Sequence, residues 1–158
     1  MAYLTILKND DPTLRKKCRE IKEITPRILT LLDDMADTMR RANGVGLAGP
    51  QVGVLRRIVV IETEPGQLYE LINPVILETS GEQTGYEGCL SLPGQCGIVT
   101  RPMNVTVEAT DRKGERYKLT GTELLARALC HEIDHLDGIL YPDNAEHMLT
   151  PEEMEELE

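Results

Sequence analysis

Residues 128–138, ALCHEIDHLDG, contain the pattern H-E-x-x-H. On an α-helix this spacing places His131 and His135 one turn apart on the same face, with Glu132 beside them. The arrangement is typical of a catalytic metal site, in which two imidazoles bind the ion. A hydrolytic metal also has a third protein ligand and one open position, so the rest of the chain has to supply that ligand.

The helix around this pattern is predicted to begin at a capping box formed by Thr120 and Glu123 and to end at Gly138. At about 100° per residue, apolar residues and His135 share one face, and Glu132 falls in the middle of it. A buried carboxylate is costly without a partner, and a water molecule on a metal is a suitable one. The opposite, polar side of the helix is predicted to hold Arg127, Cys130 and Asp134.

The third ligand has two possible sources. Downstream, one class of metalloprotease has a third histidine, but Tyr141 stands at that position here. Another class uses a downstream glutamate as the third ligand, and the candidates here are Glu146, Glu152 and Glu153. They lie in a short acidic tail typical of solvated surface. The upstream source is the segment GYEGCLSLPG, residues 85–94, which contains Cys89. A thiolate is a strong ligand for borderline and soft metals, so Cys89 completes a ligand set with the two histidines.

The remaining patterns predict an α+β fold. We expect a helix over 25–44, a glycine-rich loop over 44–53, strands over 56–62 and 68–77, a hairpin over 103–121 and a short helix from Thr150. Mixed or antiparallel strands would then pack around the central H-E-x-x-H helix, with further helices at the N-terminal and C-terminal ends. No repeat or linker divides residues 1–158, so we predict one domain.

The composition limits the class of protein. The chain has 17 Lys and Arg against 27 Asp and Glu, a formal net charge of −10, which argues against direct binding of nucleic acid or of an anionic membrane. No apolar run approaches the roughly 18 residues of a membrane span, and the N-terminus lacks a signal-peptide core. We therefore predict a cytoplasmic protein whose cysteines are thiols, namely Cys18, Cys89, Cys96 and Cys130.

Three segments carry a resemblance to a known family. GVGLAGPQ (44–51), EGCLS (87–91) and HEIDH (131–135) resemble, in this order, the three signature motifs of peptide deformylase, and the similarity to its compact bacterial class covers nearly the whole chain. The family often has Ala where Gly49 stands, and Gln where Cys130 stands. We expect Gly49 to loosen the loop, and we do not expect Cys130 to bind the metal.

The resemblance implies removal of the N-formyl group from the N-terminal formylmethionine of nascent polypeptides, with release of formate. It implies that Glu132 takes a proton from water and delivers it to the leaving amine. The side chain of Gln51 and the backbone N–H of Leu90 would donate to the developing oxyanion. The expected metal ligands are Cys89, His131 and His135, and the expected substrate contacts are Gly46, Val45, Leu124 and Ala128.

The resemblance also implies one Fe²⁺ per chain, for which Zn²⁺, Ni²⁺ or Co²⁺ can substitute. The expected partners are N-formylmethionyl nascent chains, and some family members contact the ribosome transiently through a C-terminal helix, which the short acidic tail here argues against. Two alternatives stay open. One is a zinc peptidase with a downstream Glu ligand, and the other is a metal-binding homologue without catalytic activity.

Overall fold

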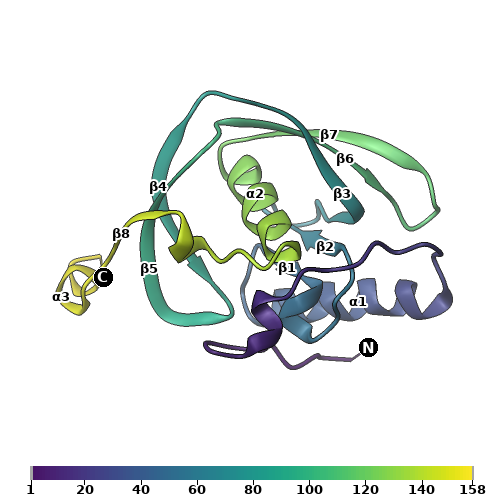
Figure 1. Ribbon diagram of the computed structural model, residues 1–158, viewed down its shortest axis with the longest axis horizontal. Helices are drawn as coiled ribbons and strands as arrows, with labels where there is room; N and C mark the ends of the chain where they lie inside the picture. The colour runs from purple at the N-terminus through teal and green to yellow at the C-terminus, as the bar shows by residue number, and fades with distance from the viewer. Residues whose placement is uncertain (1, 158) are drawn as a thin grey trace.

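Two antiparallel sheets enclose one helix, α2 (Leu124–Leu136), in the computed structural model, which describes residues 2–157. The larger sheet has the strand order β1-β2-β3-β6-β7 and the smaller one the order β4-β5-β8. Figure 1 shows α2 near the middle of the molecule and the short helix α3 (Pro151–Glu155) at its edge. The predicted α+β class, with antiparallel strands around the H-E-x-x-H helix, is confirmed.

The larger sheet contains all of the predicted strands. Its members are β1 (Gly46–Ala48), β2 (Ile58–Ile61), β3 (Tyr69–Ser80), β6 (Asn104–Thr110) and β7 (Arg116–Thr122). The predicted hairpin is β6–β7, and Gly114 has a φ of 84° in its turn, a left-handed conformation that favours glycine. Strand β1 was not predicted, and neither was the smaller sheet. The strands of the smaller sheet are β4 (Gln83–Cys89), β5 (Leu92–Arg101) and β8 (Ala145–Met148).

Two of the three helix starts follow the predicted capping chemistry. Helix α1 (Pro26–Arg41) begins after Thr25, whose side chain accepts a hydrogen bond from the N–H of Ile28. Helix α3 begins with a capping box between Thr150 and Glu153. The predicted N-terminal caps of α1 and α3 are therefore confirmed.

The capping box predicted for α2 is wrong. Thr120 lies in β7 and pairs with Thr106 of β6, so it is not available as a cap. Glu123 itself precedes the helix with a φ of 55° and makes no side-chain capping bond. The predicted end is correct, because Gly138 follows the helix with a φ of 75°.

The alternation of side chains along β2 places the larger sheet between two helices. Ile58 and Val60 pack with the apolar face of α1, including Met35. Val59 and Ile61, which point the other way, pack with α2, including Leu129. Helix α1 thus packs on one face of the larger sheet and α2 on the other, where α2 lies between the two sheets. None of the helices in residues 2–157 combines the length and apolar character needed to cross a membrane.

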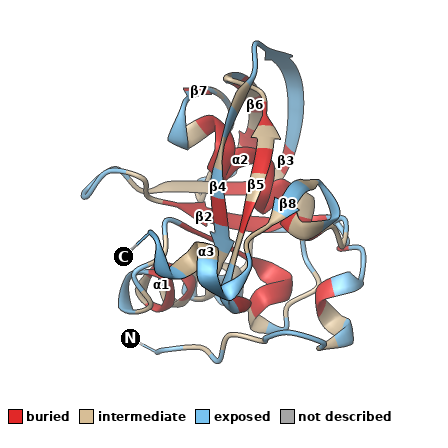
Figure 2. Ribbon diagram, turned by 90° about the vertical axis from the view of Figure 1, so that its left-hand side faces the viewer, coloured by how far each residue is buried: buried red, intermediate tan, exposed pale blue. Residues whose placement is uncertain are grey.

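Helix α2 has no polar face toward solvent. Figure 2 shows its ribbon as almost entirely buried. Arg127 and Cys130, predicted on a polar side, are only 7% and 6% exposed. This side does carry polar contacts, as predicted, but it is covered, because β4 and β5 of the smaller sheet supply Glu87 to Arg127 and Arg101 to Asp134.

Candidate metal centre

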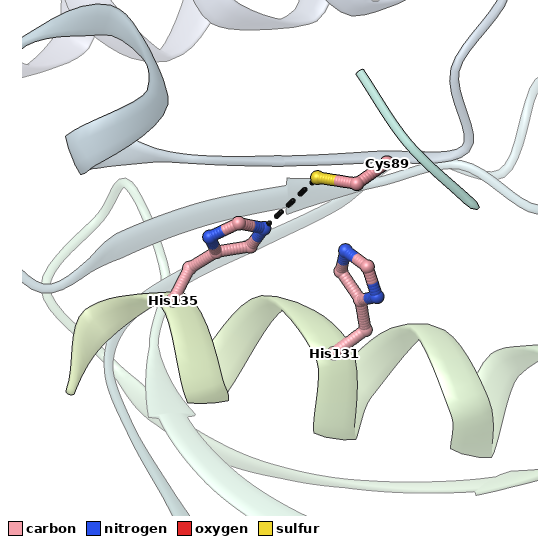
Figure 3. A group of neighbouring side chains, drawn as sticks. All are labelled: Cys89, His131 and His135. Atoms are coloured by element: carbon pink, nitrogen blue, oxygen red, sulfur yellow. Dashed lines mark hydrogen bonds between the residues drawn. The ribbon is translucent and has the colours of Figure 1, made fainter. Parts of the chain in front are cut away.

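Cys89, His131 and His135 come together between β4 and α2. One ligand atom from each lies within 4.8 Å of the others, and no other group of this kind occurs among residues 2–157. Figure 3 shows both imidazoles rising from one face of α2, with the thiol approaching from the strand opposite. The Cys89 Sγ atom lies 3.4 Å from Nε2 of His135. The structure therefore gathers the three residues that the sequence proposed as ligands.

Local geometry explains how each side chain reaches this place. The two histidines are four residues apart on a helix and so project from the same face. On β4, the register with β5 shifts between Glu87 and Cys89, and Cys89 pairs with Leu92 across a tight turn. A bulge of this kind changes the direction of a side chain at the end of a strand, and here it brings the thiol over the helix.

His131 is held by a buried carboxylate. Its Nδ1 lies 2.7 Å from Oε1 of Glu87, and the side chains are 8% and 5% exposed. Burial alone would raise the pKa of Glu87, but hydrogen bonds from Arg101 and His131 outweigh it and hold the pKa well below its usual range. The ionised carboxylate accepts the Nδ1 proton, which leaves Nε2 of His131 as the nitrogen available to a metal.

The two histidines differ in charge when no cation is bound. Burial lowers the pKa of His131, but neighbouring anionic groups, Glu132 first, raise it to about 10. Burial and the charge of His131 lower the pKa of His135 well below its usual value, so this imidazole is neutral. Binding of a cation at Nε2 of His131 would lower its pKa again, because a ligating nitrogen cannot carry a proton.

Glu132 provides the test of whether this group of residues fits a metal site. The residue is 4% exposed, and its Oε1 is buried without a hydrogen-bond partner among residues 2–157. Burial raises its pKa to about 7. Buried carboxylate oxygens normally have partners, so an unpartnered one beside a Cys-His-His group fits a site that holds a metal and its water.

Gly46 makes room for this carboxylate. A Cβ atom at residue 46 would lie 2.5 Å from Oε2 of Glu132, closer than real contacts allow. Gly49, which we expected to loosen the loop, is instead tightly packed, because its Cβ would lie 2.6 Å from the carbonyl oxygen of Val54. Both glycines thus occur where the backbone has close neighbours.

Gln51 is oriented from both ends of its amide. Its Oε1 accepts a hydrogen bond of 3.0 Å from the N–H of Ala48. Its Nε2 donates to Oγ of Ser91 at 3.1 Å and lies 3.6 Å from Sγ of Cys89. The side chain is 1% exposed, so the amide is fixed with its N–H groups toward the cysteine.

A cavity of about 360 Å³ opens onto these residues. It is lined by all but one of the predicted site residues, namely Val45, Gly46, Gln51, Cys89, Leu90, Leu124, Ala128, His131 and Glu132. The sequence did not single out the other lining residues, namely Asn43, Gly44, Tyr86, Glu87, Gly88 and Arg127. Glu87 lies inside the segment EGCLS, but no spacing rule relates it to His131, whose sequence position is 44 residues away.

The glutamates downstream of α2 lie outside this group of candidate ligands. Glu146 and Glu152 are exposed, and Glu153 pairs with His147 at 2.8 Å on the surface. Neither these residues nor Cys130 belong to the group of candidate ligands found in residues 2–157. A zinc peptidase with a downstream glutamate ligand is therefore not favoured.

Comparison with known proteins gives a consistent result. The family model described as Polypeptide deformylase matches residues 3–150. A peptide deformylase of Agathobacter rectalis is 54% identical over 159 residues, which cover 99% of this chain and 100% of that protein. One of Acetivibrio thermocellus is 57% identical over 155 residues, 98% of this chain and 91% of that protein.

Solved structures show the same similarity. A peptide deformylase from Legionella pneumophila superposes with a TM-score of 0.88 at 41% identity, covering 98% of this chain and 90% of that one. One from Synechococcus elongatus, in complex with actinonin, superposes with a TM-score of 0.88 at 36% identity, covering 97% of this chain and 82% of that one.

Proposed function

The chain belongs to the polypeptide deformylase family, and we propose that Cys89, His131 and His135 hold the metal ion on which this family depends. The reaction is the hydrolytic removal of the formyl group from the N-terminal formylmethionine of nascent polypeptides, which releases formate. One observation carries the proposal for the site. Three ligand atoms lie within 4.8 Å of one another beside a buried carboxylate oxygen that has no partner in residues 2–157.

The donor set suits a divalent transition metal. It contains one thiolate and two imidazole nitrogens, with Nδ1 of His131 already engaged by Glu87. When bound, such an ion lowers the pKa of a water ligand toward neutrality and polarises a carbonyl oxygen. The protein supplies the remaining steps with its own side chains.

Glu132 moves the proton in this proposal. Its pKa of about 7 lets it be ionised before the reaction, hold a proton during it, and be ionised again once that proton has been passed on. The carboxylate accepts a proton from the attacking water and delivers it to the amine nitrogen that leaves. The room that Gly46 gives to Oε2 supports this placement of the carboxylate.

Gln51 and Leu90 stabilise the oxygen of the formyl group as negative charge develops on it. The amide of Gln51 is already directed toward Cys89, and Leu90, the next residue in the chain, lines the same cavity. Its N–H and the Nε2 of Gln51 are the proposed donors. To donate fully, Gln51 exchanges its weak contact with Sγ of Cys89 for the substrate oxygen.

The methionine side chain occupies the apolar part of the cavity. Val45 is 40% exposed and Leu124 50% exposed, and both line the cavity, so their apolar surface is available to a ligand there. Together with Ala128 they form the proposed contact surface, and Gly46 lines the cavity beside them. A bound formylmethionyl peptide would remove these apolar side chains from water.

We further propose that residues 1–158 form a single catalytic domain and that the protein resides in the cytoplasm. The proposed physiological metal is Fe²⁺. By ligand affinity alone Zn²⁺ would bind more tightly than Fe²⁺, so metal availability has to decide the outcome. Ni²⁺ and Co²⁺ are substitutes that oxygen attacks less readily. We propose no direct binding of nucleic acid, because the chain has a net charge of −10, and the short acidic helix α3 would limit any contact with the ribosome to a transient one.

The test is to prepare the metal-free protein without oxygen, load it with each metal in turn, and follow formate release from a formylmethionyl peptide. We expect the Fe²⁺ form to be far more active than the Zn²⁺ form and to lose activity in air, whereas the Ni²⁺ and Co²⁺ forms keep theirs. Equal, air-stable activity of the zinc and iron forms would contradict the choice of Fe²⁺. Absence of formate with every metal would support the inactive homologue, and cleavage of an unformylated peptide would support the peptidase.

A further inference from the structure

Arg127 is a charged residue in the wall of the cavity. It lies on α2 one turn before His131, and it is only 7% exposed. It lines the cavity together with the apolar residues Leu124 and Ala128 and with Tyr86. An arginine is an unusual wall for a pocket that receives an apolar side chain, so its contacts need an explanation.

Within residues 2–157, one end of the Arg127 guanidinium has hydrogen-bond partners. Its Nη1 donates to Oε2 of Glu87 at 2.5 Å and to the carbonyl oxygen of Val99 at 3.1 Å. Glu87 also receives two hydrogen bonds from Arg101, at 2.8 and 2.9 Å. These bonds fix the position of Arg127 on the side of the cavity that faces β4 and β5.

The other end of the guanidinium carries donors that have no partner among the described residues. A guanidinium carries five N–H groups, and within residues 2–157 the side-chain hydrogen bonds of Arg127 come from Nη1 alone. Its Nη2 lies beside Gly85, where a Cβ atom would be 3.4 Å away, so the strand leaves space for it. No Arg127 atom is among the fully buried, unpartnered side-chain atoms of residues 2–157, so these donors reach water, and because Arg127 lines the cavity a ligand there can replace that water as the acceptor.

We infer that Arg127 is a specificity-determining residue that favours formylated substrates whose first side chain ends in a hydrogen-bond acceptor. The inference rests on the proposed function of the same cavity. The thioether sulfur of methionine is a weak acceptor, and the oxygen of methionine sulfoxide is a strong one. Norleucine has the same length and no acceptor. The resulting order of preference is methionine sulfoxide, then methionine, then norleucine.

A purely apolar pocket would give the opposite order. Methionine and norleucine would react alike, and the sulfoxide would react poorly because its oxygen would lose water without gaining a donor. The two possibilities therefore differ in one ratio, that of kcat/KM for the sulfoxide peptide to kcat/KM for the norleucine peptide. The ratio is above 1 if Arg127 donates to the substrate and below 1 if the pocket is purely apolar. A hydrogen bond to a charged donor corresponds to about 10- to 100-fold in such a ratio.

The experiment uses three N-formyl peptides that differ only in the first side chain, with the metal-loaded wild type, Arg127→Met and Arg127→Lys. Arg127→Met keeps a long unbranched chain without N–H groups, and Arg127→Lys keeps a charged donor. We expect a sulfoxide-to-norleucine ratio of about 10 to 100 in the wild type, below 1 in Arg127→Met, and above 1 again in Arg127→Lys. A ratio within one variant does not depend on how much of the protein is folded or metal-loaded.

A wild-type ratio at or below 1, or the same ratio in the wild type and Arg127→Met, would overturn the inference. If Arg127→Met does not fold, the wild-type ratio alone decides. Hydrolysis of the formylmethionyl peptide itself reports on the proposed function, so its loss with every metal would remove both proposals. Its presence with the wrong ratio would remove only this one.

Discussion

Two histidine–glutamate pairs in this protein have nearly the same geometry and different surroundings. His131 and Glu87 lie 2.7 Å apart with side chains 8% and 5% exposed, whereas His147 and Glu153 lie 2.8 Å apart with side chains 48% and 42% exposed. The first pair joins α2 to β4 inside the molecule, and the second joins β8 to α3 at its edge (Figure 1). The distance between partners therefore says little about what a pair does.

The difference lies in what else surrounds each glutamate. Glu87 is enclosed by two arginines and cannot exchange these partners for water without exposing the core. Glu153 accepts hydrogen bonds from the Thr150 backbone and from His147 in a solvated capping box. Buried charges interact strongly and are costly to leave unpaired, whereas solvent screens exposed ones. We expect substitutions around the first pair to change metal binding and catalysis, and those around the second to change neither.

The largest effect should come from removing a metal ligand beside the buried pair. Cys89→Ala and His131→Ala should each lose most of the bound metal, because two protein ligands hold a divalent ion much less tightly than three. Metal content measured by elemental analysis tests this. His147→Ala and Cys96→Ala are the matched controls and should remain fully loaded. Full occupancy in Cys89→Ala would contradict the proposed ligand set.

The second effect separates proton transfer from metal binding. Glu132→Gln keeps the size of the side chain and cannot accept a proton, so kcat should fall by about 10² to 10⁴ while the metal content stays unchanged. Steady-state kinetics on metal-replete protein provide the measurement. Glu146→Gln, on the exposed strand β8, is the control. Near-normal turnover in metal-replete Glu132→Gln would show that another group moves the proton.

Local patterns in the sequence predicted the parts of the fold that depend on local chemistry. Helix α1, the β6–β7 hairpin and helix α3 all follow from caps, turns and periodic apolar residues near one another in the chain. The spacing of His131 and His135 is equally local, so the helical half of the site could be proposed directly. Cys89 carries no periodic signal, so it was proposed from the need for a third ligand and from thiolate chemistry, and the family resemblance supported it.

The smaller sheet and the polar network could not be predicted in this way. Strands β4 and β5 contain scattered glycines and polar residues, so their apolar alternation is weak. Without that sheet, the helix side bearing Arg127 could be predicted as polar but not as buried. Its true partner, Glu87, lies 40 residues away in sequence, and ion pairs at such separations leave no periodic trace.

The third effect concerns the orientation of a ligand by its neighbour. In Glu87→Gln the neutral amide no longer balances Arg101 and Arg127, so the free energy of unfolding of the metal-free protein should fall by about 3 to 5 kcal/mol. His131 should also be oriented less firmly, which should weaken metal binding by about 10- to 100-fold. Denaturant unfolding and competition with a chelator measure the two effects. Wild-type values for both would mean that the buried pair is no more important than an exposed one.

The smallest effect should come from the same change in the exposed pair. In Glu153→Gln the neutral side chain can still accept a hydrogen bond from the Thr150 backbone, so the capping box persists. That bond, followed by the one from His147, lowers the pKa of Glu153 from its ordinary value of 4.5. A lowered pKa stabilises the folded state above pH 4.5, and this contribution disappears as the pH falls through the lower, folded-state value. At neutral pH any benefit of the charge is therefore fully present, so this is the condition for the measurement. We expect the thermal midpoint and the chelator titration of Glu153→Gln to match the wild type there, in low and in high salt, because solvent screens the pair. A fall in metal affinity as large as that in Glu87→Gln would show that burial does not distinguish the two pairs.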